Sequence, residues 1–220
     1  MSDMNVEQAR FNMIEQQIRP WDVLDQRVLD TLTAVHREDF VPERYRDLAF
    51  SDLNLPLDHG QVMMSPKLEG RLLQALDVQP SDSVLEVGTG SGYLSACLGR
   101  LAGSVLSVDL FEDFKFTAQK KAALAGIRNV KYRVADAAAG WDPNSRFDCI
   151  AVTGSLPELH RGFHDALAVG GRLFVIVGKP PVMEALLITR VAPDQWARES
   201  LFETSIPALI HAEKPQPFVF

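Results

Sequence analysis

In the first third of the chain, apolar residues recur at helical spacing and predict three helices. The first covers residues 6–18, and the second follows Asp25 as its N-cap residue. The third begins at Ser65 and Pro66, with the serine as N-cap and the proline in the first turn. The positions expected to be buried on these helices are Phe11, Ile14, Ile18, Val28, Leu29, Leu32, Val35, Leu68, Leu72, Leu73 and Leu76. Residues 40–66 interrupt the periodicity with prolines and predict a long loop, a kind of segment that often carries function.

From residue 83 onward the pattern changes to short apolar strands that alternate with stretches able to form helices. The strand candidates read SVLEVG, SVLSVD, VKYRVAD, FDCIAVTG and GRLFVIVG. Helices are expected between them over residues 93–101, 112–124 and 157–167. Strands that are apolar throughout and alternate with helices are typical of a parallel sheet covered on both faces. A last pair of strands around residues 192–194 predicts an antiparallel hairpin at one edge of the sheet.

The chain has 220 residues, of which 46% are hydrophobic, and this suits one α/β unit. We expect residues 81–220 to form a Rossmann-like domain, with a helical portion and substrate-side loop at residues 1–80 packed on it. The formal net charge of −7 argues against broad contact with nucleic acid or an anionic membrane. Cys97 and Cys149 are interpreted as buried thiols in a reducing compartment. With no signal-peptide pattern and no apolar run of about 20 residues, a cytoplasmic protein is expected.

The segment EVGTGSG links an expected strand to an expected helix and has the clearest chemical signature. Dinucleotide sites use G-x-G-x-x-G, whose third glycine lets the helix pack closely on the strand. Here Gly88 and Gly90 match, but Tyr93 stands at the third position and the glycines continue to Gly92 instead. Glu86, near the carboxyl end of the strand, would repel a phosphate and attract a cation. The turn therefore favours a phosphate-free, positively charged nucleoside, and S-adenosyl-L-methionine has that character.

Two further acids end the next two strands and are expected beside this turn. Asp109, about 20 residues beyond the turn, is placed to accept both ribose hydroxyls, a feature that nicotinamide enzymes share. Asp136 ends the third strand, where it can accept the adenine amine, and Thr153 ends the fourth. The predicted cofactor site comprises Glu86, Gly88, Thr89, Gly90, Ser91, Gly92, Asp109, Leu110, Asp136, Ala137 and Thr153. The expected cofactor is S-adenosyl-L-methionine and the expected product is S-adenosyl-L-homocysteine.

Single residues of this set also have simpler interpretations. Glu86 can cap the following helix, and Asp136 can be a turn residue before the AAAG segment. His160 and His164 have an i, i+4 spacing that suits a metal ion, but no third ligand accompanies them. We therefore expect this pair on the exposed face of a helix and predict no metal site.

Five segments together resemble one known family. They read HREDFVPERY, LPLDHGQ, LEVGTGSGYLSACLG, GWDPNSRFDCIAVTGSLPELH and LAVGGRLFVIVG, and they are similar, in the same order, to protein-L-isoaspartate O-methyltransferases. The similarity extends over residues 7–209. It implies a class I methyltransferase fold with an extra N-terminal helical portion, and methyl transfer to the α-carboxylate of isoaspartyl residues in damaged proteins. The resulting ester cyclises to a succinimide and reopens partly as aspartate, which is a protein repair reaction.

This reaction suits a sequence without an obvious catalytic set. A carboxyl group with a pKa of about 4 is already an anion at neutral pH and needs no general base. The enzyme has to align oxygen, methyl carbon and sulfur and to exclude water. The sequence accordingly assigns no catalytic residue.

The loop that follows HGQ departs from the family's usual Thr-Ile-Ser-Gln-Pro, whose serine lies beside the transferred methyl group. When the two are aligned on the proline, Val62 replaces the threonine, Met64 the serine and Ser65 the glutamine. Losing a hydroxyl donor to a carboxylate costs roughly 1.5–3 kcal/mol per charge-assisted bond, whereas methionines offer adaptable apolar contact. The predicted acceptor pocket comprises His59, Val62, Met63, Met64 and Ser65.

Three functions are therefore kept open. The first is methylation of an isoaspartyl-containing protein or peptide, as the resemblance implies. The second is methylation of a small-molecule or phenolic acceptor, for which His59 is the best candidate base, although bonding to loop backbone is a simpler role for it. The third is non-catalytic binding of S-adenosyl-L-methionine or its product on behalf of a partner protein. A nicotinamide oxidoreductase is disfavoured by Tyr93 and Glu86, and the sequence predicts no particular oligomeric state.

Overall fold

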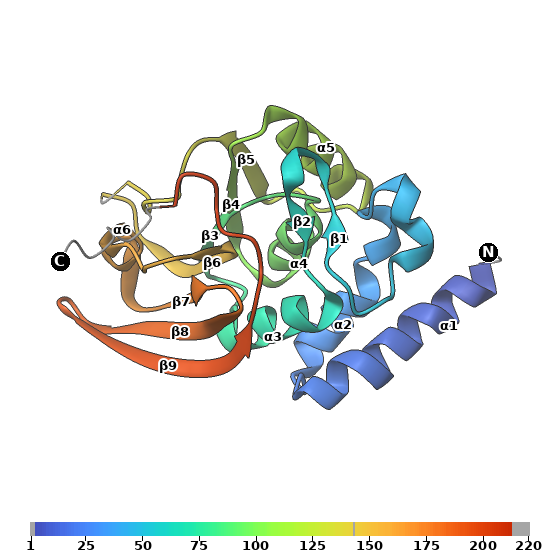
Figure 1. Cartoon of the computed structure of the whole chain (residues 1–220), viewed down its shortest axis with the longest axis horizontal. Helices are drawn as coiled ribbons and strands as arrows, with labels where there is room; N and C mark the ends of the chain where they lie inside the picture. The colour runs from blue at the N-terminus through green and yellow to red at the C-terminus, as the bar shows by residue number, and fades with distance from the viewer. Residues whose placement is uncertain (1–2, 143, 213–220) are drawn as a thin grey trace.

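The structure, a computed structural model, describes residues 3–142 and 144–212, and its centre is a seven-stranded sheet (Figure 1). The strands lie in the order β5-β4-β3-β6-β7-β8-β9. They are β3 (Ser83–Val87), β4 (Ser104–Asp109), β5 (Val130–Val134), β6 (Phe147–Leu156), β7 (Leu167–Lys179), β8 (Val182–Ala192) and β9 (Gln195–Thr204). All neighbours from β5 to β7 are parallel, and β7, β8 and β9 are antiparallel. The α/β class and the antiparallel edge hairpin predicted from the sequence are confirmed.

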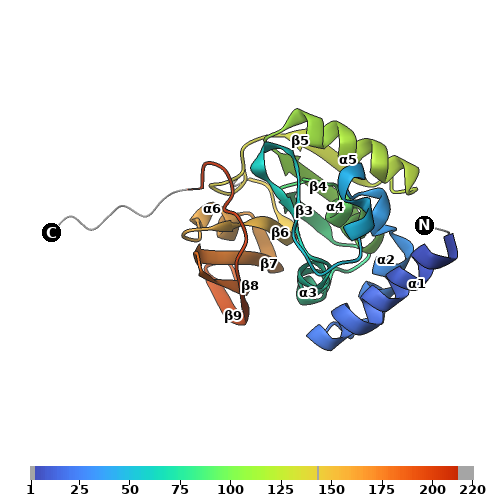
Figure 2. The ribbon, with the colours of Figure 1, turned by 45° about the vertical axis from the view of Figure 1, so that its right-hand side comes forward.

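Helices cover both faces of this sheet (Figure 2). On one face lie α4 (Tyr93–Leu101) and α5 (Glu112–Leu124), which have the bounds that the sequence predicts, and on the other lies α6 (Arg161–Asp165). One large apolar cluster includes Cys97 of α4, and a second includes Phe163 of α6. The apolar runs of β3 and β6 are explained by this arrangement, because these central strands are buried on both faces.

The N-terminal helices pack on the α4 side. They are α1 (Asp3–Met13), the π-helix η1 (Ile14–Ile18), the 3-10 helix η2 (Arg19–Trp21), α2 (Gln26–Ala34) and α3 (Pro66–Leu76). Asp25 caps α2 as predicted, since its carboxylate accepts the Arg27 N–H at 2.7 Å. The prediction for Phe11 is wrong, because its side chain is 58% exposed and Met13 is buried instead. The wide π turn that follows α1 changes which side chains face inward.

The predicted long loop contains short elements. These are the 3-10 helices η4 (Glu43–Leu48) and η5 (Asp58–Gly60) and the strands β1 (Leu55–Pro56) and β2 (Val62–Met63), and a further 3-10 helix, η3 (Arg37–Asp39), comes directly before the loop. β1 and β2 pair antiparallel, so residues 55–65 form a small hairpin followed by the start of α3. We call this segment the acceptor loop.

The helix expected over residues 157–167 is shorter than predicted. β6 continues to Leu156, and His160 is the N-cap of α6 because its Nδ1 accepts the Gly162 N–H at 3.0 Å. His164 is half-buried, with its ring 5.3 Å from that of Trp196, and burial lowers its pKa. The two histidines therefore do not share an exposed helix face, contrary to expectation. Within the described ranges, no group of three or more His, Cys, Asp or Glu side chains is arranged to hold a metal ion.

The sheet topology fixes where a ligand can bind. β3 lies between β4 and β6, so the chain runs to one side of β3 through α4 and to the other side through β6 and β7. Crevices in open α/β sheets form at the carboxyl ends of strands where the order reverses in this way. Among the helices that the structure describes, none is long and apolar enough to cross a membrane.

Candidate active site

The turn between β3 and α4 needs glycine for two physical reasons. Gly88, Gly90 and Gly92 all have positive φ angles, of 98°, 49° and 82°. Gly92 also lies against α5, where an added Cβ would stand 2.5 Å from the Cβ of Ala118, and a Cβ on Gly88 would collide with the Thr153 hydroxyl. The glycine pattern therefore fixes a tight turn at the carboxyl end of β3.

Asp109 ends β4 beside this turn, as predicted. Its Oδ2 accepts the Gly90 N–H at 2.9 Å and its Oδ1 accepts the Phe111 N–H at 3.1 Å. Burial raises the pKa of Asp109, and these N–H groups oppose that effect. The half-buried side chain also lines a cavity in front of the turn. Its carboxylate is therefore held in place by backbone and is still accessible to a ligand.

Asp136 lies just beyond β5 and lines the same cavity. Its Oδ1 accepts the Ala138 N–H at 3.1 Å, and its Oδ2 is 2.7 Å from Nδ1 of His211. The Ala138 N–H, and then His211, hold the pKa of Asp136 below its usual range. This carboxylate is ionised at neutral pH.

The cavity between these acids has a volume of about 40 Å³. It is lined by Gln61, Val87, Gly88, Val108, Asp109, Leu110, Phe111, Ala135, Asp136, Ala137, Ala138, Leu209 and Ile210. Five residues of the predicted cofactor set are among them, namely Gly88, Asp109, Leu110, Asp136 and Ala137. None of the lining residues carries a positive charge. Gln61, Leu209 and Ile210 are missing from the sequence-based set, although the HGQ segment of the family resemblance contains the first of them.

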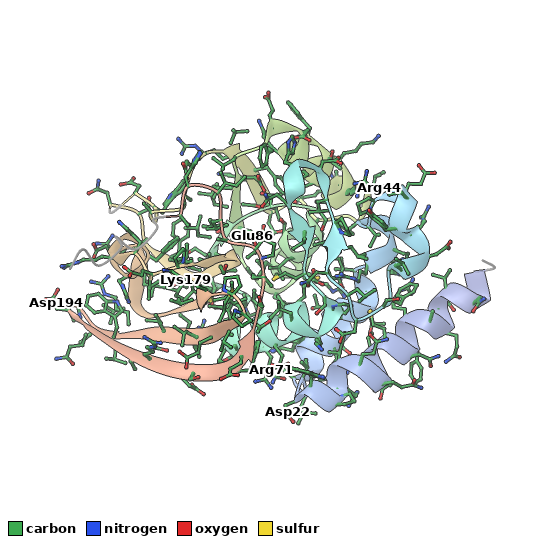
Figure 3. All side chains as sticks on the ribbon, in the orientation of Figure 1. Asp22, Arg44, Arg71, Glu86, Lys179 and Asp194 are labelled. Atoms are coloured by element: carbon green, nitrogen blue, oxygen red, sulfur yellow. The ribbon has the colours of Figure 1, made fainter. Side chains whose placement is uncertain are left out.

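Glu86 differs from its expected placement at the crevice. Figure 3 shows it in the interior, where it is fully buried and its Oε2 accepts hydrogen bonds from the hydroxyls of Ser95 and Ser107. Burial raises the pKa of Glu86 to about 8, and the two serines oppose that effect. Since Val84, Leu85 and Val87 make both faces of β3 apolar, the sequence pattern does not reveal which face of the strand is the interior one for this side chain. Glu86 lies under the turn and does not line the cavity.

Three more members of the predicted set support the turn from within. Thr89 is buried with its hydroxyl 2.6 Å from that of Ser107, which joins it to the Glu86 network. The Thr153 hydroxyl lies 2.7 Å from the Gly88 carbonyl oxygen and 2.9 Å from that of Val87. Ser91 accepts the N–H of Tyr93 at 3.3 Å. These hydroxyls hold the shape of the turn, and none of them lines the cavity.

His59 is held in the acceptor loop by two contacts. Its ring stacks on Phe111 with a centroid separation of 3.8 Å, and its Nε2 is 2.9 Å from Oδ2 of Asp113. The pKa of Asp113 is lowered chiefly by this hydrogen bond. The left-handed backbone of His59 (φ 56°) turns the hairpin at this point. Its nitrogen is thus directed at the start of α5.

The methionines of the acceptor loop face the core, contrary to the expectation that they line a pocket. Met63 and Met64 are 3% and 4% exposed and belong to the apolar cluster that contains Tyr93. The Met64 carbonyl accepts a hydrogen bond of 2.7 Å from the guanidinium of Arg37. Val62 is half-buried. The serine-to-methionine change therefore adds core packing beneath the loop.

Arg37 ties the acceptor loop to three other segments. It is fully buried, forms an ion pair with Glu69 of α3 and donates to the Ala49 carbonyl at 2.9 Å. Its guanidinium also lies 5.1 Å from the ring centroid of Tyr93, the first residue of α4. Burial raises the pKa of Glu69 to about 7, and Arg37 opposes that effect. Sequence reasoning missed this residue, although it falls in the HREDFVPERY segment.

Ser65 stands at the N-cap position of α3 but does not make the predicted capping bond. Its carbonyl accepts the N–H groups of Leu68 and Glu69 at 3.1 Å, whereas its hydroxyl caps no backbone N–H. Its own N–H donates to Oδ1 of Asn54 at 2.9 Å. Pro66 fills the first position of the helix and needs no N–H partner there.

Comparison with known proteins gives consistent matches over this whole arrangement. The family model described as protein-L-isoaspartate(D-aspartate) O-methyltransferase matches residues 8–200. The chain is 37% identical over 205 residues to protein-L-isoaspartate O-methyltransferase 1 of Rhodopseudomonas palustris (strain HaA2), covering 93% of this chain and 84% of that protein. It is 34% identical to protein-L-isoaspartate O-methyltransferase 2 of Pelobacter propionicus, covering 95% and 93%.

The fold is also found among solved structures. A Plasmodium falciparum beta-aspartate methyltransferase, in complex with S-adenosyl-L-homocysteine, superposes with a TM-score of 0.76. The match covers 92% of this chain and 97% of that chain at 20% identity. The likeness therefore extends to the N-terminal helices as well as the sheet.

Proposed function

The chain belongs to the protein-L-isoaspartate(D-aspartate) O-methyltransferase family, and from that membership we propose that it methylates isoaspartyl residues of damaged proteins. It is an S-adenosyl-L-methionine-dependent O-methyltransferase, as its relatives are. In this proposal the acceptor is the α-carboxylate of an isoaspartyl residue in a protein or peptide. The observation that carries the proposal is the pair of carboxylates, Asp109 and Asp136, at the switch point of the sheet beside the glycine turn.

The residues at the cavity fit S-adenosyl-L-methionine better than a dinucleotide. A diphosphate needs cationic or N–H donors, and no lining residue carries a positive charge. The Gly90 N–H is already given to Asp109. A nucleoside with hydroxyl and amine donors and a cationic sulfur matches two carboxylates instead. When bound, the cofactor supplies an electrophilic methyl group on that sulfur.

Each acid has a separate proposed role. Asp109, with both oxygens braced by backbone N–H groups, accepts the ribose hydroxyls. Asp136 accepts the adenine amine, with Leu110 and Ala137 beside it in the cavity wall. Glu86 supports the turn through Ser107 and Thr89 and does not touch the ligand. In this proposal the two half-exposed acids, Asp109 and Asp136, recognise the cofactor, and the buried Glu86 maintains the shape of the glycine turn.

The acceptor needs little chemical activation. An isoaspartyl carboxylate is deprotonated at neutral pH, so the protein has no proton to remove before methyl transfer. Its tasks are to bring the carboxylate in line with the methyl group and to exclude water. Gln61 of the acceptor loop, which lines the cavity, is the proposed side chain nearest to this step.

Two features weigh against a phenolic acceptor. The methionines that would line a flat apolar pocket are buried in the core. His59, which would have to accept the phenol proton, stacks on Phe111 and bonds Asp113. An acceptor that is already ionised fits this loop better.

The test is a methyl-transfer assay with S-adenosyl-L-methionine labelled on the methyl group. One peptide carries an isoaspartyl residue and the control has the same sequence with ordinary aspartate. The expected result is label in the isoaspartyl peptide only, released as methanol by mild base. Equal labelling of both peptides, or base-stable label, would contradict the proposal, and S-adenosyl-L-homocysteine binding without turnover would favour the non-catalytic alternative.

We also propose a cytoplasmic location, where isoaspartyl proteins would be the partners. The buried, unpaired thiols of Cys97 and Cys149 support a reducing environment.

A further inference from the structure

The segment that follows β9 crosses the carboxyl end of the sheet, as the red trace in Figure 1 shows. We call residues 205–212 the strap. It is fastened to β6 at Ser155, whose N–H donates to the Pro207 carbonyl and whose carbonyl accepts the Leu209 N–H, both at 2.9 Å. The buried Ser155 hydroxyl donates to the Ile206 carbonyl at 3.0 Å. The strap is thus anchored as far as Leu209, and its described remainder, residues 210–212, makes no further backbone hydrogen bond to β6.

The strap narrows the proposed cofactor site. The Leu209 side chain lies over two glycines, since a Cβ added to Gly154 would stand 2.6 Å from it and one on Gly88 3.9 Å. Leu209 and Ile210 both line the cavity. Its volume of about 40 Å³ is far below the roughly 300–1,000 Å³ of small-molecule sites. The cavity is also open to solvent on one side, so in this arrangement it encloses only part of a nucleoside.

His211 contacts Asp136, the acid that is proposed to accept the adenine amine. Its Nδ1 lies 2.7 Å from Oδ2 of Asp136, and Oδ1 of the same carboxylate already accepts the Ala138 N–H. The backbone of His211 is left-handed (φ 67°), a conformation that histidine adopts more readily than most residues other than glycine. The hydrogen bond between His211 and Asp136 thus lies directly beyond the anchored part of the strap.

We propose that His211 competes with the adenine amine for Asp136 and thereby sets the affinity for S-adenosyl-L-methionine and S-adenosyl-L-homocysteine. This rests on the proposed function, because it takes Asp136 as the acceptor of the adenine amine. In the free protein His211 satisfies the outward oxygen of Asp136. Binding replaces that contact with the amine and swings the end of the strap away, while the anchor at Ser155 stays in place.

The expected size of the effect follows from exposure. The side chains of His211 and Asp136 are 64% and 47% exposed, and ion pairs between exposed groups are weak. Competition of this strength lowers cofactor affinity by about two- to fivefold. His211 therefore adjusts affinity without blocking the site.

The test is titration calorimetry of S-adenosyl-L-homocysteine with the full chain and with His211→Ala. We expect the variant to bind about two- to fivefold more tightly. The matched control is His36→Ala, which removes another exposed histidine beside an aspartate, Asp39, at 3.9 Å, and should leave the affinity unchanged. In an Asp136→Ala background, His211→Ala should have no effect, because the group for which it competes is gone.

Each outcome is decisive. Equal or weaker binding by His211→Ala overturns the proposal, and weaker binding would instead make the histidine part of the adenine site. Tighter binding that persists without Asp136 also overturns it, because the strap would then act by covering the cavity alone. If the unaltered chain does not bind S-adenosyl-L-homocysteine, the proposed function itself fails, and this result is separate from the comparison of variants.

Discussion

Asp109 combines a structural and a recognition role in one carboxylate. It holds Gly90 and Phe111 by their N–H groups and is still accessible from the cavity. Asp109→Ala should weaken S-adenosyl-L-methionine binding by about 1–3 kcal/mol through the lost charge-assisted contact. Calorimetry measures this directly. Asp109→Asn keeps one carbonyl oxygen and should give an intermediate loss, and an unchanged affinity in both variants would remove the assignment.

Glu86 makes the stability of the fold depend on pH. Because burial raises its pKa to about 8 from 4.5, the folded chain binds this proton more tightly than the unfolded chain does. The stabilising contribution is complete below about pH 4.5 and is lost as the pH rises through about 8. Glu86→Gln mimics the neutral acid. Between about pH 4.5 and 8 its free energy of unfolding should therefore fall less than that of the unaltered protein.

The difference between the two proteins has an upper limit of about 4–5 kcal/mol, at 1.36 kcal/mol per unit of pKa shift. Urea unfolding at several pH values measures it. If the two proteins show parallel pH dependence, Glu86 is ionised in the folded state and the assignment is wrong. Asp47→Asn is the control, because that acid is exposed and lies on another element, η4.

At the scale of elements, Arg37 connects the N-terminal portion to the acceptor loop. Removing it alone leaves Glu69 buried and unpaired, and breaking such a pair costs about 3–5 kcal/mol of stability. A double change, Arg37→Met with Glu69→Leu, replaces the pair with apolar side chains and should be far less destabilising. It still loses the hydrogen bonds to the Met64 and Ala49 carbonyls.

The double variant should therefore show a raised KM for the isoaspartyl peptide while its affinity for S-adenosyl-L-homocysteine changes little. Steady-state kinetics and calorimetry separate the two effects. Equal losses in both measurements would indicate a general structural role, and no loss in either would show that the acceptor loop holds its shape without this tie.

Much of the element order can be predicted from the sequence, and the failures have physical causes. Helices α4 and α5 each follow a strand and a turn that the sequence marks clearly, and their observed bounds match the predicted ones. α6 is shorter because His160 caps it from within the expected helix. The side chains of Glu86, Met63 and Met64 face the interior because of packing partners that lie far away in the sequence. The strap has no periodic pattern, so its position over the cavity could not be derived.

At the scale of the whole molecule, we propose that residues 1–80 and 81–220 fold as one unit. The largest apolar cluster contains Leu29 of α2 and Leu73 of α3 together with Leu98 of α4 and Phe174 of β7. Thermal unfolding should therefore give a single cooperative transition by calorimetry, with equal calorimetric and van't Hoff enthalpies. Two resolved transitions would contradict this prediction.

A saturating ligand should shift that transition as a whole. At 100 times its dissociation constant, S-adenosyl-L-homocysteine adds about 2.7 kcal/mol to the free energy of unfolding. Asp109→Ala at the same ligand concentration should show a smaller shift. A ligand-induced shift confined to part of the transition would place the N-terminal helices outside the cooperative unit.

The position of β3 in the sheet also affects how the chain folds while it is being synthesised. This central strand gains its second neighbour only through β6, and the contact between Ser83 and Asp148 that fastens the pair spans 65 residues. A chain emerging from the ribosome therefore carries β3 with one side open until β6 has left the exit tunnel. The chain is synthesised at about 5–20 residues per second, so the 65 residues that separate Ser83 from Asp148 take several seconds.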